Sequence, residues 1–185
     1  FFEQYSQLEQ ELYETYPQNI SFKNGLAIAY SKLGSTHSAL SNLDKALTFF
    51  EQFSQLEQEL YEAYPQHVSF KNGLAVSYEK LGETHSALGN LDKALTYYEK
   101  DLALTKELYK TYPQHVSFKN GLAISYAKLA VFHRDKKMDA TTARSYFIQA
   151  QILWQELTEF APQFIEFQKC SKMVQDDLRK LEEEA

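Results

Sequence analysis

Five histidines are the residues of this sequence that could bind a metal ion or transfer a proton near neutral pH. His37, His85 and His133 recur with a sequence period of 48. Zinc needs ligand nitrogens at about 2.1 Å, whereas equivalent residues of successive structural units lie about one helix pair apart. We therefore predict no metal site and interpret these three side chains as packing groups between helices. His67 and His115 are predicted in the first turn of a helix, on a solvated surface.

Serine and aspartate recur with the same period, so a Ser-His-Asp set would be present in several copies and would not converge on one site. The sequence contains no HExxH zinc motif, no phosphate-binding glycine loop and no nucleophile elbow. We predict a protein that is not an enzyme, without catalytic residues and without a cofactor.

The charge of the chain narrows the class of partner. The formal net charge is -6 and the isoelectric point is about 5.4, which disfavours nucleic acid, because phosphate binding needs a basic face. No apolar run approaches the roughly 20 residues of a membrane helix, so no membrane partner is expected. The single cysteine, Cys170, cannot form an intramolecular disulfide, which favours a reducing, cytoplasmic location.

The main feature of the sequence is an internal repeat, which must position any site. Pro17, Pro65 and Pro113 follow one another with the period of 48, each within the sequence Tyr-Pro-Gln. Residues 1–48 differ from residues 49–96 at only nine positions. A third copy follows and diverges after its first half, with one inserted residue. The repeat therefore arose by duplication of one structural unit.

Each unit is predicted to contain two helices, A and B. In the second copy, Leu74, Tyr78 and Leu81 recur at steps of three and four residues, which keeps them on one face of helix A. Gly89-Asn90 interrupts this pattern, and helix B then runs to the proline of the next Tyr-Pro-Gln sequence. Helices of about 20 to 22 residues, roughly 30 Å long, are expected.

We predict one all-α domain that spans residues 1–185 and consists of antiparallel helix hairpins. Its parts in chain order are the second helix of a truncated repeat (1–16), repeats at 17–64 and 65–112, a divergent repeat at 113–161 and a capping helix at 162–185. An apolar stripe is predicted to bury the capping helix, and it comprises Phe164, Ile165, Phe167, Met173, Val174, Leu178 and Leu181.

The unit resembles the tetratricopeptide repeat in the spacing of its large and small residues. In the second copy these residues are Tyr78, Leu81-Gly82, His85, Gly89, Ala94, Tyr98 and Asp101. The family's usual period is about 34 residues, so this chain adds one heptad to each helix, which preserves the buried face. The resemblance implies a right-handed α-α superhelical solenoid in which Gly82 and Ala94 let the two helices approach closely. Gly25, Gly73 and Gly121 are expected at further close helix contacts.

The resemblance also implies where a ligand binds, because the family's concave groove is lined by helix A. The matching positions form the predicted peptide-binding groove: Asn24, Ile28, Ser31, Ser35, Asn72, Val76, Glu79, Glu83, Asn120, Ile124, Ala127 and Arg134. The clamp by which some members hold a C-terminal carboxylate needs Lys and Asn. This chain has Ser31, Glu79 and Ala127 at clamp positions, so such a ligand is not expected.

The three groove asparagines have two interpretations. Stacked amides can pair with the backbone of an extended peptide, because each amide has a donor and an acceptor. Alternatively, they are copies of one ancestral residue that bridges helices. Glu79 and Glu83 favour a neutral or basic peptide segment.

We therefore expect a non-catalytic scaffold that holds a protein or peptide. One alternative is self-association through exposed aromatic residues at the chain start, Phe1, Phe2 and Tyr5. A second alternative, by resemblance, is the sensor arm of a larger bacterial signalling or defence protein.

Overall fold

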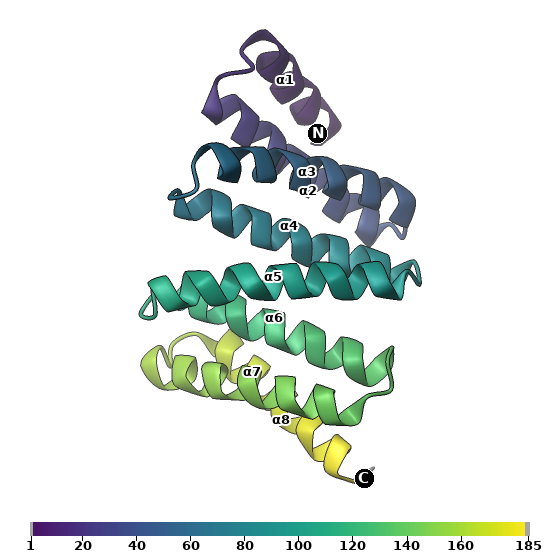
Figure 1. Cartoon of the computed structure of the whole chain (residues 1–185), viewed down its shortest axis with the longest axis vertical. Coiled ribbons are helices and arrows are strands. Elements are labelled where there is room, and N and C mark those ends of the chain that lie inside the picture. The colour runs from purple at the N-terminus through teal and green to yellow at the C-terminus, as the bar shows by residue number, and fades with distance from the viewer. Residues whose placement is uncertain (1, 184–185) are drawn as a thin grey trace. The chain divides into compact units, whose positions relative to one another are not determined.

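The computed structural model describes residues 2–183, with side chains from Gln7 to Glu183. These residues form eight α-helices and no strand (Figure 1). In chain order they are α1 (Phe2–Thr15), α2 (Ile20–Ala39), α3 (Leu43–Ala63), α4 (Val68–Ala87), α5 (Leu91–Thr111), α6 (Val116–Asp135), α7 (Ala140–Phe160) and α8 (Ile165–Glu183). The predicted all-α class of helix hairpins is confirmed. The side chains of Phe1, Phe2 and Tyr5, on which the self-association hypothesis rests, lie outside the described residues.

The chain divides into two compact units, Phe1–Asp101 and Leu102–Ala185. In the first unit α1 packs against α2, α2 against α3, and α3 against α4. In the second unit α6 packs against α7, and α7 against α8. Helices α2, α4 and α6 are the A helices of the repeat, and α3, α5 and α7 are the B helices. The single-domain arrangement over residues 1–185 stays a prediction.

The Tyr-Pro-Gln sequences form the turns between one hairpin and the next. Each proline lies two residues after the last helical residue, because it has no N–H group to continue the helix. Asn19 caps α2, since its Oδ1 accepts hydrogen bonds from the N–H groups of Ser21 (2.9 Å) and Phe22 (3.4 Å). His67 and His115 occupy the same position before α4 and α6 without a side-chain cap bond. They therefore precede the first turn in which the sequence analysis placed them.

The turn between helices A and B requires a left-handed residue. Gly89 has φ +78° there, and the equivalent Ser41 has φ 59°. The left-handed residue turns the backbone away from the helix axis and so ends helix A. The N–H of Asn90 then bonds the carbonyl of His85 in the last turn of the helix, at 2.8 Å. Glycine adopts the conformation without steric cost, which explains why the repeat tolerates this residue at its tightest point.

Small residues set the contact between helices A and B in the first unit. A Cβ atom at Gly82 would lie 2.7 Å from two ring carbons of Tyr98, and one at Gly34 would lie 2.6 Å from the ring of Phe50. Ala94, in the first turn of α5, is fully buried. The close approach predicted at Gly82 is therefore present, and it places a buried aromatic ring directly over the backbone of helix A.

Each A helix also has a glycine nearer its N-terminus, and the surroundings of this glycine differ among the three helices. A Cβ atom at Gly25 would overlap the carboxylate of Glu9, and one at Gly73 would overlap the carboxylate of Glu57. A Cβ atom at Gly121 would have nothing within 4 Å. The predicted close contact exists at the first two glycines and is wrong for Gly121.

A matched pair of glycine substitutions tests this packing. Gly82→Ala is expected to lower the free energy of unfolding by about 1–2 kcal/mol, because the overlap with Tyr98 outweighs the gain of about 1 kcal/mol in helix propensity. Gly121→Ala should raise it by up to about 1 kcal/mol, because only the propensity changes. Urea denaturation followed by circular dichroism measures both. Equal effects of the two substitutions would contradict the packing described here.

Helix α8 closes the second unit with fewer apolar residues than predicted. Phe167, Val174 and Leu181 are buried, but Phe164, Ile165 and Met173 are each at least half exposed. Phe167, Val174 and Leu181 follow one another at steps of one heptad and stay on one side, whereas Ile165 and Met173 fall well away from that side at about 100° per residue. The predicted stripe was therefore too wide, since Phe164, Ile165 and Met173 are exposed rather than buried.

Candidate peptide-binding surface

The groove residues of α2 share one side of that helix. At about 100° per residue, Asn24, Ile28, Ser31 and Ser35 lie on the side opposite the buried Leu26. Ile28 is 44% exposed, which is unusual for a large apolar side chain in the middle of a long helix. The hydroxyl of Ser35 donates to the carbonyl of Ser31 at 2.9 Å. This side of α2 therefore offers an apolar centre with polar groups around it.

On α4 the equivalent residues are half-buried: Asn72, Val76, Glu79 and Glu83. Lys80 lies between the two carboxylates, with its Nζ 3.0 Å from Glu83 and 3.9 Å from Glu79. Burial alone would lower the pKa of Lys80, but these carboxylates outweigh burial and raise its pKa. Lys80 therefore stays charged at neutral pH and partly neutralises the acidic side of α4.

On α6 the predicted groove residues are largely engaged within the second unit. Asn120 Oδ1 accepts a hydrogen bond of 2.9 Å from the indole N–H of Trp154. Arg134 pairs with Asp177 of α8 at 2.9 Å and lies over the ring of Phe147. Ala127 is 8% exposed and Ile124 is half-buried.

The asparagines therefore differ from one repeat to the next. Asn120 bridges α6 and α7, as the second interpretation of the sequence requires. The amides of Asn24 and Asn72 make no side-chain hydrogen bond to any described residue. Both are half-buried, so their donors and acceptors remain available to a ligand.

Residues 25–107 match the family model described as tetratricopeptide repeat. These residues belong to the tetratricopeptide repeat family. Members of this family are in general protein-interaction scaffolds without catalytic activity. None of the described helices is long and apolar enough to cross a membrane.

Three solved structures are similar to the chain. A thermophilic TPR protein of Thermus thermophilus has a TM-score of 0.46 and 12% sequence identity over 94% of this chain and 90% of that chain. A de novo designed helical repeat protein has a TM-score of 0.40 and 11% identity, over 99% and 92%. BtubC from P. vanneervenii has a TM-score of 0.40 and 14% identity, over 98% and 88%. No curated protein matches the sequence.

Helix α8 has residues at positions equivalent to the predicted groove of α6, and they were not among the groove residues predicted from the sequence. Lys169, Met173, Asp176 and Lys180 are the equivalents of Asn120, Ile124, Ala127 and Val131 one repeat later, with the inserted residue counted. With Lys172 and Asp177 they line an open hollow of about 350 Å³. The signal was the offset of the last copy, which exceeds the period by that one residue. It was obscured because the final helix was interpreted only as a cap.

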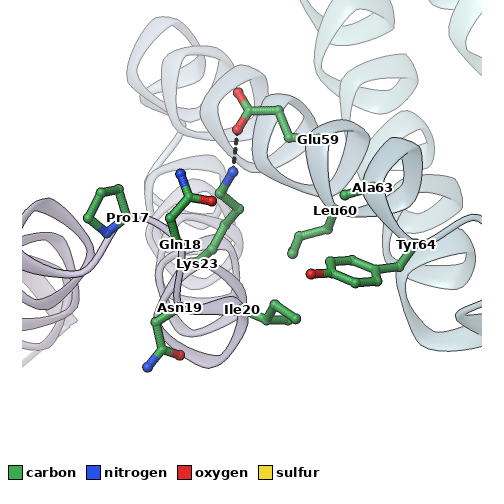
Figure 2. A pocket seen from close by; sticks show the side chains of 9 residues that line it. All are labelled: Pro17, Gln18, Asn19, Ile20, Lys23, Glu59, Leu60, Ala63 and Tyr64. Atoms are coloured by element: carbon green, nitrogen blue, oxygen red, sulfur yellow. Dashed lines mark hydrogen bonds and ion pairs between the residues drawn. The ribbon is translucent and has the colours of Figure 1, made fainter.

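A small pocket of about 80 Å³ lies where the first Tyr-Pro-Gln turn meets the end of α3. Figure 2 shows Lys23 reaching from α2 to Glu59 of α3 beside this pocket, with Nζ and Oε2 2.7 Å apart. The hydrogen bond from Lys23 lowers the pKa of Glu59. Lys119 and Glu156 form the equivalent pair at 2.8 Å in the second unit. These pairs join helix A to helix B of one tetratricopeptide hairpin, and we assign the pocket a structural role.

The recurring histidines lie between helices of the same hairpin. His37 stacks on Phe49 with centroids 5.4 Å apart, and His85 stacks on Tyr97 at 5.5 Å. Burial, followed by the charge of Lys93, lowers the pKa of His85. The described residues contain no group of three or more His, Cys, Asp or Glu that could hold a metal ion. His37 and His85 therefore pack their rings against an aromatic ring of the next helix, at the position where the repeat resembles the tetratricopeptide spacing.

Proposed function

We propose that this tetratricopeptide chain is a non-catalytic scaffold that holds a neutral or basic peptide segment of another protein along its A helices. The observation that carries the proposal is the pair of unpaired, half-buried amides of Asn24 and Asn72. Both side chains are half-buried, and an amide has both donors and an acceptor, so these two amides can pair with the N–H and C=O groups of an extended peptide. The cytoplasm is the expected location.

Each group on the surface has a role in this proposal. Asn24 and Asn72 pair with the peptide backbone, and the exposed Ile28 contacts an apolar side chain. Glu79 and Glu83 attract a basic residue, and Lys80 limits the strength of that attraction. In the second unit, Ile124, Ala127 and Arg134 are the equivalent positions of α6, where Asn120 holds α6 to α7. The self-association and sensor-arm alternatives stay hypotheses.

A peptide array tests the function. The purified chain is applied to immobilised extended peptides of equal length whose net charge is positive, neutral or negative. We expect retention of neutral and positive peptides over negative ones. The double variant Asn24→Ala with Asn72→Ala should lose roughly tenfold in affinity for a retained peptide, because two hydrogen bonds of about 0.5–1.5 kcal/mol each are removed.

Asn42→Ala is the matched control. Asn42 is exposed and makes no side-chain cap bond, so its removal should change affinity less than twofold. Equal affinity of the double variant and the unmodified chain would overturn the role of the amides. Preferential retention of acidic peptides would overturn the assignment of the partner's charge.

A further inference from the structure

The first unit contains a second pocket, on the side of α2 away from Asn24 and Ile28. It lies between α1 and α3, has a volume of about 230 Å³ and includes Tyr30 and Leu26 of α2 in its lining. Helix α1 contributes Gln10, Tyr13 and Glu14 to the walls, and α3 contributes Gln52 and Glu59. We call it the α1–α3 pocket. It combines an aromatic and aliphatic floor with a polar rim.

In the two later repeats, a lysine ammonium group lies over the tyrosine ring that is equivalent to Tyr30. Tyr78 is equivalent to Tyr30, and the Nζ of Lys100 lies 5.3 Å from its ring centroid. Tyr126 is equivalent as well, and the Nζ of Lys106 lies 5.3 Å from its ring centroid in the second unit. An ammonium group at this distance over an aromatic face is attracted by the ring quadrupole. The chain thus supplies its own lysine to two of the three tyrosines.

The first repeat lacks this lysine and retains the rest of the site. Gln52 stands one repeat before Lys100, and Gln10 stands two repeats before Lys106. Tyr30 still packs against Phe49, with centroids 6.0 Å apart, as Tyr78 packs against Tyr97 at 5.9 Å. Among the described residues no cation lies over the Tyr30 ring.

The polar groups around Tyr30 also favour a cation. Burial and then the negative charge of Glu14 raise the pKa of Tyr30. In the described part of the chain, Glu14 accepts a hydrogen bond from Gln10 at 2.9 Å and pairs with no cation. At the other wall Glu59 is already neutralised by Lys23.

The hydroxyl group of this tyrosine has a hydrogen-bond partner in the second repeat but not in the first. The hydroxyl of Tyr78 donates to Gln58 Oε1 at 3.0 Å. The hydroxyl of Tyr30 bonds no described residue. The α1–α3 pocket is therefore lined by a tyrosine ring that has no cation over it, a phenol oxygen that bonds no described residue and a carboxylate without a counter-ion among the described residues.

We propose that the α1–α3 pocket binds a lysine side chain of a partner protein, with its ammonium group over Tyr30 and beside Glu14. The methylene groups of this lysine lie on Leu26 and Leu56, and the ammonium takes the place that Lys100 occupies over Tyr78. The site is distinct from the proposed peptide surface, because Leu26 and Asn24 are two residues apart and point to opposite sides of α2.

Nuclear magnetic resonance titration of the whole chain tests this proposal with N-acetyl-lysine methylamide as the probe. Saturable shifts of the Tyr30 and Leu26 signals are expected at low ionic strength. The norleucine analogue, which has no charge, should produce no such shifts at the same concentration. Equal shifts with both probes, or none with the lysine probe, would overturn the proposal.

Gln52→Lys is the decisive variant, because it copies Lys100 into the first repeat and should occupy the site from within. We expect at least a tenfold loss of affinity for the lysine probe. Gln66→Lys adds the same charge in an exposed turn and should change affinity less than twofold. Unchanged binding by Gln52→Lys would contradict the proposal. Asn24→Ala with Asn72→Ala should leave binding of this probe intact, which separates the result from the test of the peptide surface.

Discussion

Trp154→Ala is expected to lower the free energy of unfolding by about 3–5 kcal/mol, the range for removing a buried aromatic side chain. Trp154 is 2% exposed in the core of the second unit, and its indole N–H donates to Asn120. The substitution leaves a large cavity between α6 and α7 and an unpaired amide oxygen. Because Trp154 is the single tryptophan of the sequence, unfolding must be followed by circular dichroism rather than by intrinsic tryptophan fluorescence.

Asparagine variants measure the contribution of the hydrogen bond between Trp154 and Asn120 separately from the cost of the cavity. Asn120→Ala should cost about 1–3 kcal/mol, because it leaves the buried indole N–H without an acceptor. Asn72→Ala removes an amide that bonds no described residue, so a change of under about 0.5 kcal/mol is expected. A cost below about 1 kcal/mol for Trp154→Ala would show that the indole does not support this core.

The stability of the chain is expected to fall by about 3 kcal/mol as pH rises from 4.5 to 7. Glu57 of α3 is 4% exposed, and its carboxylate lies against Gly73 of α4. Its Oε2 has no hydrogen-bond partner among the described residues. Burial raises the pKa of Glu57 from 4.5 to about 7. The folded protein therefore holds this proton more tightly than the unfolded chain does. The stabilising effect is complete below pH 4.5 and is lost by the time pH exceeds the folded pKa.

Urea denaturation at pH 5 and pH 8 measures this effect against two variants. Glu57→Gln should remove most of the difference in unfolding free energy between the two pH values, because the amide does not titrate. Glu99→Gln changes an exposed residue of α5 and should keep the difference seen in the unmodified chain. The same pH dependence in Glu57→Gln and the unmodified chain would contradict the assignment to Glu57.

The repeat made most of the fold predictable. The regular sequence period, the Tyr-Pro-Gln turns and the spacing around Gly82 indicated both helices of each hairpin and their closest contact. These features are local, since turn residues and small residues act on their own backbone and on the helix that follows. The same reasoning failed at Phe164 and Ile165, which lie at the start of the last helix, where periodicity gives little guidance.

The candidate site was less predictable because equivalent residues face different partners. Asn120 bonds Trp154, while the residues equivalent to Trp154 in the earlier copies are Glu57 and Thr105. Gly73 contacts Glu57 closely, but Gly121 has open space in front of it. The stretch Ser-Phe-Lys-Asn-Gly-Leu-Ala, which is identical in α2, α4 and α6, therefore meets B helices that differ from one another. A sequence period reveals that the asparagines are equivalent, but it does not reveal which of them is already bonded.

The near identity of residues 1–48 and 49–96 has a consequence for the gene. Unequal recombination between these two stretches would remove or add one whole repeat in frame. The helices brought together at the new junction would have nearly the same sequences as helices that already pack in this chain. The number of hairpins can therefore change in a single genetic event without requiring a new interface to evolve.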